Sequence, residues 1–380
     1  MWQATCWNGW PDGRRGGLGG IGRGGYHLPA MSLHQIIGFC HAADGTRIAV
    51  AACGQGPVML RAAHWLSHCH HDLDSPVWRP WLAAFARQYR FVRYDPRGCG
   101  LSDRFVADLS FDAWQTDLDA VAATIADPRF VLLGLSQGGA LAIRFALAHR
   151  GRVSHLVLLN AYAQGGRVRA GSEAERLEAE TLVNFVRIGW GRENPAFCQF
   201  FTNLFIPGGT AEQHRWWGDL ERLTAAPDVA ARLLWEMQGI DVTDQARQLR
   251  VPTLILHCRD DMRVPFEEGC KLAALIPDAR FVPLDSANHV LLPSEPAWAV
   301  MHEEIARFLG RDGAPPALRR AALTPAEAQV LDLVAKGLNN RAIAERLGKS
   351  EKTVRNQLSV IFDKLGVESR AQAIVLALGA

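Results

Sequence analysis

The chain has 380 residues, of which 48% are hydrophobic and 21% are charged, so its length and composition suit a soluble protein of two or three compact units. Its eight cysteines include no Cys-x-x-Cys pair, which indicates reduced thiols and a cytoplasmic location rather than a disulfide framework. No apolar run reaches the roughly 18 residues that a membrane-spanning helix needs, so we expect no membrane partner.

The charge is unevenly distributed along the chain. The formal net charge is +2, but residues 317–380 alone carry 10 Lys and Arg against 6 Asp and Glu. A basic segment attached to a more acidic body predicts a polyanionic partner for that segment.

Residues 1–30 are rich in glycine, contain three arginines and have no apolar core of the kind found in signal peptides. We expect a disordered or non-native leader here, and the alternative is an RNA-binding Gly/Arg tail. Globular patterning begins at Met31, so translation starts at either Met1 or Met31.

Strand-like and helix-like patterns alternate after the leader. We expect strands or helices, judged by their apolar periodicity and their turn residues, in the following order: strands at 46–52 and 58–63, a helix at 75–88, a strand at 89–95, a helix at 111–127, a strand at 129–134, a helix at 138–151 and a strand at 153–161.

A helical stretch, roughly 165–248, then interrupts the alternation before strands resume at 251–258 and 280–285 and a helix closes the unit at 294–310. The alternation predicts an α/β fold with a mostly parallel sheet, and the helical stretch is placed where a cap would cover the sheet edge. Four cap tryptophans indicate an aromatic pocket wall: Trp190, Trp216, Trp217 and Trp235.

Ser136 lies in the sequence Gly-Leu-Ser-Gln-Gly, between a short apolar strand and a helix that opens with Gly138 and Gly139. This matches G-x-S-x-G in the strand–turn–helix context that the motif requires. The turn lifts the serine hydroxyl above the sheet, and the helix N-terminus favours developing negative charge. We therefore interpret Ser136 as a candidate nucleophile.

A serine nucleophile needs a base and a carboxylate that orients the base. Asp260 and Asp261 follow an apolar strand, and His289 lies in a loop after the next strand. The order Ser, Asp, His is the one expected for this motif. His302 lies in the middle of the last helix, and we expect it to be solvated.

These features, together with the segment VRYDPRGCGLSD, make residues 33–310 resemble the α/β-hydrolase fold. In that segment the matching residues are Asp95, Arg97, Gly98, Gly100 and Ser102. The resemblance implies that Asp261, four residues before Pro265, is the acid of a Ser136–His289–Asp261 triad, with Asp260 as the alternative. The fold does not define the substrate.

The chain departs from this family after the third strand, where the family usually has His-Gly and this chain has RAAHWLSHCHHD. By resemblance, the oxyanion hole would consist of the backbone N–H groups of Trp65, or less clearly Leu66, and Gln137. A bulky residue at this point would narrow the pocket, and loss of one oxyanion donor costs about 10²–10³ in rate.

The same stretch is rich in metal-ligand types: His64, His68, Cys69, His70, His71 and Asp72. Neighbouring residues rarely converge on one ion, and no second cluster with finger-like spacing follows. We therefore expect a loop near the pocket mouth, with metal binding as the alternative, and we expect no cofactor.

Residues 311–322 contain Gly and Pro but no periodicity, which indicates a linker, and residues 323–380 are purely helical in pattern. Thr324 and Glu327 form a capping box with Pro325 at the first helical position. Asn339 or Asn340 starts a second helix and Ser350 a third, so the pattern is that of a helix-turn-helix.

The third helix sorts its residues by face. Its apolar residues recur at helical spacing: Val354, Leu358, Ile361 and Leu365. Another face carries side chains suited to base edges in the major groove, namely Lys352, Arg355, Asn356 and Ser359. Four further residues could contact phosphates, namely Thr353, Lys364, Asn340 and Arg341.

This C-terminal segment resembles the LuxR-type DNA-binding domain over its full length, from LTPAE through KLGV to SR. Gln357 stands where that family often has histidine. The resemblance implies binding of double-stranded DNA as a homodimer, with the dimer contact in residues 369–378 and an inverted-repeat operator.

Together these features favour a DNA-binding transcriptional regulator whose α/β-hydrolase-like domain senses, and can hydrolyse, a small apolar or ester-like molecule. The alternative is a serine hydrolase of the esterase or lactonase kind with an accessory DNA-binding tail. A third hypothesis is a receptor without catalysis.

Overall fold

The computed structural model describes residues 33–65, 67–192, 195–310, 324–336 and 338–365, together with 370 and 373. The predicted leader (1–30) and linker (311–322) lie outside the described residues. The chain divides into two compact units at the bond between His302 and Glu303.

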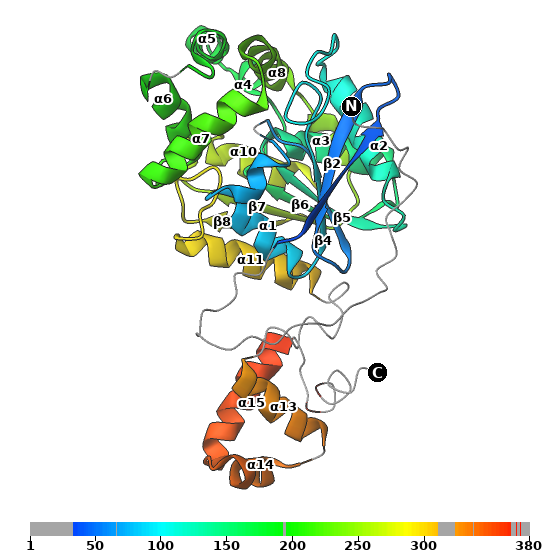
Figure 1. Ribbon diagram of the computed structural model, residues 1–380, viewed down its shortest axis with the longest axis vertical. Helices are drawn as coiled ribbons and strands as arrows, with labels where there is room; N and C mark the ends of the chain where they lie inside the picture. Colours follow the sequence, from blue (N-terminus) through cyan, green and yellow to red (C-terminus); the bar gives the residue numbers. More distant parts are fainter. Residues whose placement is uncertain are drawn as a thin grey trace, which may run out of the picture. The chain divides into compact units, whose positions relative to one another are not determined.

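The first unit is built on an eight-stranded sheet with strand order β1-β2-β4-β3-β5-β6-β7-β8 (Figure 1). All neighbouring strands from β4 to β8 in this order are parallel, whereas β1–β2 and β2–β4 are antiparallel. The strands are β1 Gln35–His41, β2 Arg47–Cys53, β3 Val58–Arg61, β4 Arg90–Tyr94, β5 Phe130–Leu135, β6 Val153–Leu159, β7 Thr253–Cys258 and β8 Arg280–Leu284. The predicted mostly parallel sheet is confirmed.

Helices cover the sheet because βαβ connections return the chain across its faces. Helix α1 (Trp78–Ala86) packs against α11 (Pro296–Leu309), with the Trp81 ring 5.2 Å from that of Trp298. Helix α2 (Phe111–Ala123) packs on α3 (Gln137–Ala148), and α10 (Phe266–Leu275) packs on β7 and β8. A short 3-10 helix, η1 (His71–Asp74), precedes α1.

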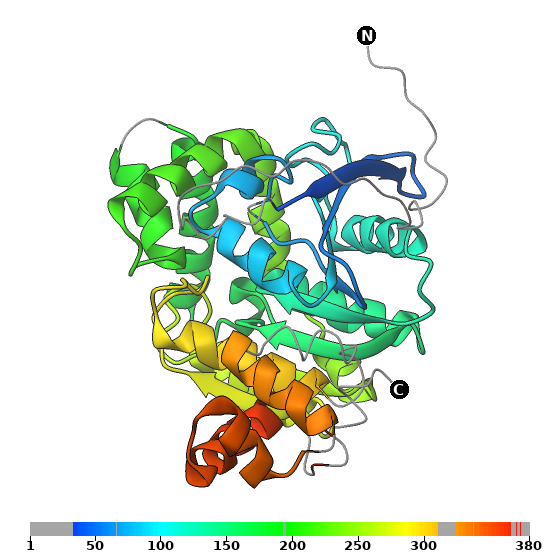
Figure 2. The same ribbon diagram turned by 60° about the horizontal axis from the view of Figure 1, so that its bottom comes forward.

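Among the described residues, six helices lie between β6 and β7 in the chain, where the helical stretch 165–248 was expected. They are α4 Gly166–Arg169, α5 Glu173–Gly189, α6 Pro195–Phe205, α7 Ala211–Thr224, α8 Pro227–Gly239 and α9 Thr243–Gln248. Figures 1 and 2 show α5 to α8 gathered at one side of the sheet, whereas α9 packs back on α3 and α10. We call α4–α8 the cap.

The expectation that His302 is solvated is wrong. Its ring packs 4.5 Å from that of Trp298 and 5.1 Å from that of Phe85. Its Nε2 atom is buried and has no hydrogen-bond partner among the described residues. Burial lowers the pKa of His302 to about 4. On α11, His302 lies next to the apolar residues that face α1. The periodicity of one helix does not show how much of its surface a second helix covers, so the burial of His302 could not be predicted from it.

The described part of the second unit contains α13 (Pro325–Ala335), α14 (Asn340–Leu347) and α15 (Glu351–Leu365). The Thr324–Glu327 capping box is present, and Asn339, not Asn340, caps α14. The Ser350 hydroxyl accepts a hydrogen bond from the Thr353 N–H at 3.1 Å. Each predicted helix start therefore has a physical cap.

A small apolar core holds these three helices together. It consists mainly of Val330, Leu331, Leu333, Val334, Ile343, Ala344, Val354, Leu358 and Ile361. The predicted inward face of α15 is thereby confirmed for its described side chains, and the side chain of Leu365 is not among them. Across the parts of the chain that the structure covers, no helix is both long and apolar enough to cross a membrane.

Candidate active site and nucleic-acid interface

Ser136 sits at the turn between β5 and α3 with φ 56° and ψ −129°. This left-handed conformation is uncommon for a residue with a side chain. The turn is held by the Ser136 N–H, which donates to the Leu159 carbonyl at 3.0 Å, and by the Gly139 N–H, which donates to the Ser136 carbonyl at 2.9 Å. A Cβ on Gly134 would collide with the backbone of Gly139, so the turn requires a glycine there.

The structure brings Asp261 and His289 together. The Asp261 Oδ2 atom accepts a hydrogen bond from His289 Nδ1 at 2.7 Å. The other carboxylate oxygen of Asp261 accepts the backbone N–H groups of Arg263 and Val264 at 2.8 and 3.1 Å. The neighbouring Asp260 is exposed, so its carboxylate is not the partner of His289.

His289 and Ser136 line the same cavity, which we call the Ser136 cavity. Nε2 of His289 is buried and has no hydrogen-bond partner in the described part of the chain. A nucleophile and a base facing one space is the arrangement that covalent catalysis needs.

The Ser136 cavity is narrow and aromatic. Its free volume is about 20 Å³, which is close to what one water molecule occupies. The lining comprises His64, Trp65, Trp78, Leu135, Ser136, Gln137, Tyr162, Phe205, Trp217, Met237, Arg263, His289 and Val290. A small acyl group therefore requires a rearrangement of the lining side chains.

Of the four cap tryptophans predicted to form a pocket wall, Trp217 lines the Ser136 cavity. Trp190 stacks on Trp65 at 4.9 Å and so supports that wall from behind. Trp216 instead stacks on His71 at 4.8 Å. Trp235 is 39% exposed, with the Arg167 guanidinium 3.7 Å from its ring.

The two predicted oxyanion donors, the N–H groups of Trp65 and Gln137, have no hydrogen-bond acceptor within the described residues. Both residues line the Ser136 cavity. Where the family usually has glycine, this chain has Trp65, and its side chain fills space in the wall of the Ser136 cavity. Leu66 lies outside the described residues.

The family-like loop after β4 fixes the chain near Trp65. The Asp95 carboxylate accepts the Ser67 hydroxyl at 2.6 Å and the Leu101 N–H at 2.9 Å. The Ser102 hydroxyl donates to the Asp95 carbonyl at 2.6 Å. These contacts join residues 67–69 to the loop that follows β4.

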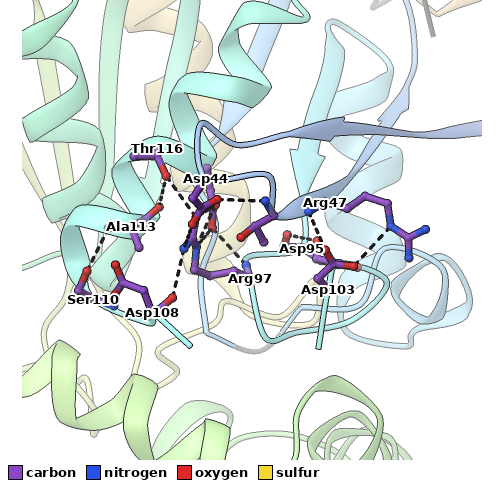
Figure 3. Close-up of polar contacts among 12 residues, drawn as sticks. Asp44, Arg47, Asp95, Arg97, Asp103, Asp108, Ser110, Ala113 and Thr116 are labelled. Atoms are coloured by element: carbon purple, nitrogen blue, oxygen red, sulfur yellow. Dashed lines mark hydrogen bonds and ion pairs between the residues drawn. The ribbon is translucent and has the colours of Figure 1, made fainter. Parts of the chain in front are cut away.

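Arg97 anchors the same loop from the other side (Figure 3). Its buried guanidinium pairs with Asp117 of α2 at 2.8 Å and with Asp44 of the β1–β2 turn at 2.7 Å. It also donates to the Asp108 carbonyl at 3.1 Å. Arg97 therefore connects the β1–β2 turn to α2 by ion pairs, so we assign it a structural role.

The histidine-rich stretch spreads its side chains in different directions. The His64 ring stacks on Trp78 at 4.6 Å, and burial lowers the pKa of His64 well below its usual value. Asp72 pairs with Arg93 at 3.4 Å. Over the residues that the structure covers, no three His, Cys, Asp or Glu side chains form a group that could hold a metal ion.

Sequence reasoning did not predict the importance of Asn160, which follows β6. Its side chain donates to the His289 carbonyl at 2.7 Å and accepts the Cys258 N–H at 2.8 Å. Its φ of 48° is a conformation in which asparagine is enriched. The only sequence signal was an asparagine at the end of a buried strand.

His257 was also not predicted. It is fully buried, with Nε2 3.9 Å from Asp261 Oδ2 and 3.1 Å from the Val264 carbonyl. Burial lowers its pKa, which favours the neutral form of the ring beside the carboxylate that binds His289.

In the second unit, α15 presents the predicted face to solvent, because Lys352, Thr353, Arg355, Asn356 and Ser359 are all exposed. Nothing is described of the Lys364 side chain. On α14, Arg341 is exposed and pairs with Glu345, whereas Asn340 accepts a hydrogen bond from Arg370 at 3.0 Å. The predicted dimer segment, 369–378, lies outside the described residues except for positions 370 and 373.

The first unit is a hydrolase-fold domain, with a serine on a strand-to-helix turn facing a carboxylate-bound histidine, and the second is a helix-turn-helix. Family models match both, namely the alpha/beta hydrolase family over residues 49–303 and the bacterial regulatory proteins of the luxR family over residues 321–377. The chain belongs to the alpha/beta hydrolase family, and it continues into a LuxR-type DNA-binding domain.

Individual relatives match one unit or the other. The AB hydrolase superfamily protein YisY of Bacillus subtilis is 28% identical over 204 residues, which cover 53% of this chain and 75% of YisY. A non-heme haloperoxidase of Rhodococcus erythropolis is 28% identical over 261 residues, which cover 66% of this chain and 92% of that protein. The transcriptional regulatory protein YdfI of Bacillus subtilis is 48% identical over 56 residues, 15% of this chain and 26% of YdfI.

Solved structures agree on the fold. An esterase from Exiguobacterium antarcticum superposes with a TM-score of 0.59 at 21% identity and covers 72% of this chain and 98% of its own. An enol-lactonase from Burkholderia xenovorans gives a TM-score of 0.57 at 20% identity, with 72% and 100% covered. At this level of identity the likeness establishes the fold and leaves the substrate open.

Proposed function

We propose that the chain is a transcriptional regulator that binds DNA through its LuxR-type domain and a small molecule through its hydrolase-fold domain. The observation that carries the proposal is the presence, in one chain, of a Ser136 cavity and a helix-turn-helix with an exposed polar face. A dedicated DNA-binding module has no use in a simple metabolic enzyme, whereas a regulator needs both a ligand pocket and a DNA contact.

In this proposal α15 is the recognition helix. Arg355 and Asn356 read base edges, because arginine and asparagine make bidentate hydrogen bonds to guanine and adenine. Lys352 and Ser359 assist on the same face, while Thr353, Lys364, Asn340 and Arg341 contact phosphates and set the register. A cytoplasmic homodimer joined through residues 369–378 would read an inverted repeat.

Selection from a pool of random double-stranded DNA tests this part of the proposal. We expect the full chain to enrich a defined sequence with salt-dependent affinity, and Arg355→Ala to lose about 1–3 kcal/mol of discrimination at one base pair. Arg346→Ala, which removes an equal charge from the exposed part of α14, should weaken binding without changing base preference. No enrichment at moderate salt would refute the proposal.

A second activity, ester hydrolysis, is favoured by the hydrogen bond between Asp261 and His289 and by the unpaired Nε2 atom of His289. In this proposal Nε2 takes the proton of the Ser136 hydroxyl while its oxygen attacks the substrate carbonyl. The Trp65 and Gln137 N–H groups stabilise the resulting oxyanion. His289 then returns the proton to the leaving alcohol, and water hydrolyses the acyl-enzyme by the same route.

Treatment of the intact protein with a fluorophosphonate, followed by mass measurement, tests the reactivity of Ser136. We expect a single adduct that Ser136→Ala and His289→Ala both lose, together with loss of p-nitrophenyl ester turnover. Ser110→Ala is a matched control, since the Ser110 hydroxyl caps α2 far along the chain from the Ser136 turn. If a folded protein forms no adduct, the cavity belongs to a receptor without catalysis.

A further inference from the structure

Arg263 occupies a position between two cavities. It follows Asp261 by two residues in the loop after β7 and lines the Ser136 cavity. It also lines a wide groove of about 1010 Å³ beside α4, α5 and α10. We call this the cap groove. Arg263 is the residue that both of these linings share, so it borders both spaces.

The guanidinium of Arg263 has no hydrogen-bond or ion-pair partner among the residues that the structure describes. Asp261 is the nearest acid in sequence, but its two oxygens are occupied by His289 and by backbone N–H groups. In the described residues, none of the glutamates of the cap groove pairs with Arg263. Glu175 accepts the Gly171 N–H, and Glu268 lies 3.8 Å from Lys271.

A second guanidinium adds to this positive charge. Arg169 lines the cap groove as well, and its one described contact is to the Gln164 carbonyl at 3.3 Å. Burial is the main cause that lowers the pKa of Arg263, and the charge of Arg169 acts in the same direction. The groove lining also contains Lys271, Asp261 and four glutamates. Among the described residues, none of these carboxylates forms an ion pair with Arg169 or Arg263.

A partly buried guanidinium without a counter-ion is costly, because burial removes water that would otherwise solvate the charge. Buried polar groups in proteins are nearly always hydrogen-bonded to protein or to ordered water, so a guanidinium without a protein partner is available to bind a ligand. Arginine is also the side chain best suited to a carboxylate, which it binds through two parallel hydrogen bonds.

We propose that Arg263 recognises a carboxylate on the small molecule, so that the ligand of the Ser136 cavity is an acidic ester with an anionic group a few bonds from the carbonyl that Ser136 attacks. This inference rests on the proposed ester hydrolysis for its catalytic part. The carbonyl end occupies the narrow Ser136 cavity, and the acidic end lies at Arg263, with the remainder in the cap groove beside Arg169.

Two esters that differ in one carboxylate test this proposal. Mono-p-nitrophenyl glutarate carries the acyl chain of p-nitrophenyl butyrate with a terminal carboxylate added. We expect the wild-type protein to prefer the glutarate ester in kcat/KM. We expect Arg263→Met to lose that preference by roughly 10- to 100-fold, the range typical of a hydrogen-bonded charge. The preference is the ratio of kcat/KM for the two esters in the same variant, so a change in turnover common to both esters cancels.

Two further variants separate a specific contact from general electrostatics. Arg263→Lys keeps the charge without the planar fork, and we expect it to retain part of the preference. Arg259→Met removes a charge from an exposed side chain that lines neither cavity, and we expect no change in preference. An equal loss in Arg259→Met and Arg263→Met would overturn the proposal.

A binding measurement distinguishes failure of this inference from failure of the hydrolysis proposal. Glutarate should raise the melting temperature of Ser136→Ala, which cannot form an acyl-enzyme, but not that of the Ser136→Ala/Arg263→Met double variant. If no ester is hydrolysed but this difference is present, the carboxylate site stands and catalysis fails. If butyrate is hydrolysed, but glutarate neither binds nor improves the substrate, the carboxylate site is refuted and the hydrolase remains.

Discussion

At the scale of single residues, the wall of the Ser136 cavity is assembled from side chains that lie far apart in the sequence. Ser136, Asp261 and His289 stand next to strand ends in a recognisable order, because the turn at Ser136 requires specific small neighbours. Tyr162, Met237 and Arg263 carry no such local signal. Their place in the lining depends on how the cap folds over the sheet, which no local pattern encodes.

Met237 offers a prediction at this scale. It lines both the Ser136 cavity and a neighbouring cavity of about 20 Å³, so Met237→Ala should join the two spaces. We expect esters with longer acyl chains to gain in kcat/KM, by up to about fourfold for each methylene that becomes buried. A series of p-nitrophenyl esters from acetate to octanoate measures this gain.

The control for this experiment is Met301→Ala. Met301 is fully buried on α11 and lines neither cavity. Both variants should lose about 2–5 kcal/mol of stability, as is usual for truncation of a buried methionine. A shift in chain-length preference that appeared in Met301→Ala as well would show that loosened packing, and not the joined cavity, is responsible.

At the scale of elements, alternating periodicity located the parallel strands and the long amphipathic helices, and caps such as Thr324 and Ser350 located helix starts. No strand is predicted from the sequence over Gln35–His41, although the structure has β1 there. This strand is at the edge of the sheet and pairs with β2 alone. It buries little apolar surface, so its pattern was weak.

Helix α11 carries a prediction about pH. Burial against Phe85 and Trp298 lowers the pKa of His302 to about 4, below the usual value of about 6.5. A depressed pKa means that the unfolded chain binds the proton more readily. His302 therefore contributes stability above about pH 6.5, and this stability is lost as the pH falls toward 4.

We expect His302→Phe to reduce the acid-induced loss of unfolding free energy by roughly 2–3 kcal/mol between pH 7 and 4. Urea unfolding followed by tryptophan fluorescence measures it, since residues 303–380 contain no tryptophan and nine of the twelve tryptophans lie within residues 31–302. The difference in unfolding free energy between the two proteins at pH 8 gives the effect of the substitution on packing. If the unfolding free energies of the two proteins changed equally with pH, the prediction would be contradicted.

At the scale of the whole molecule, the change from mixed α/β pattern to purely helical pattern identified two domains of different kinds. The family matches end at residue 303 and resume at residue 321, and the contacts divide at His302. Two kinds of pattern indicate two domains, because each unit must bury its own apolar residues. The sequence could not tell how occupancy of one unit alters the other, since that depends on free-energy differences between whole conformations.

The narrowness of the Ser136 cavity has a consequence for how fast the protein responds. A space with room for about one water molecule cannot admit a larger ligand until the cap opens, and motions of this kind take microseconds to milliseconds. Association is then slower than diffusion allows, and the same closure retards escape. The occupancy of such a cavity would follow the ligand concentration averaged over the residence time of each ligand. A regulator built on it would respond to a sustained change in ligand concentration and not to a brief one.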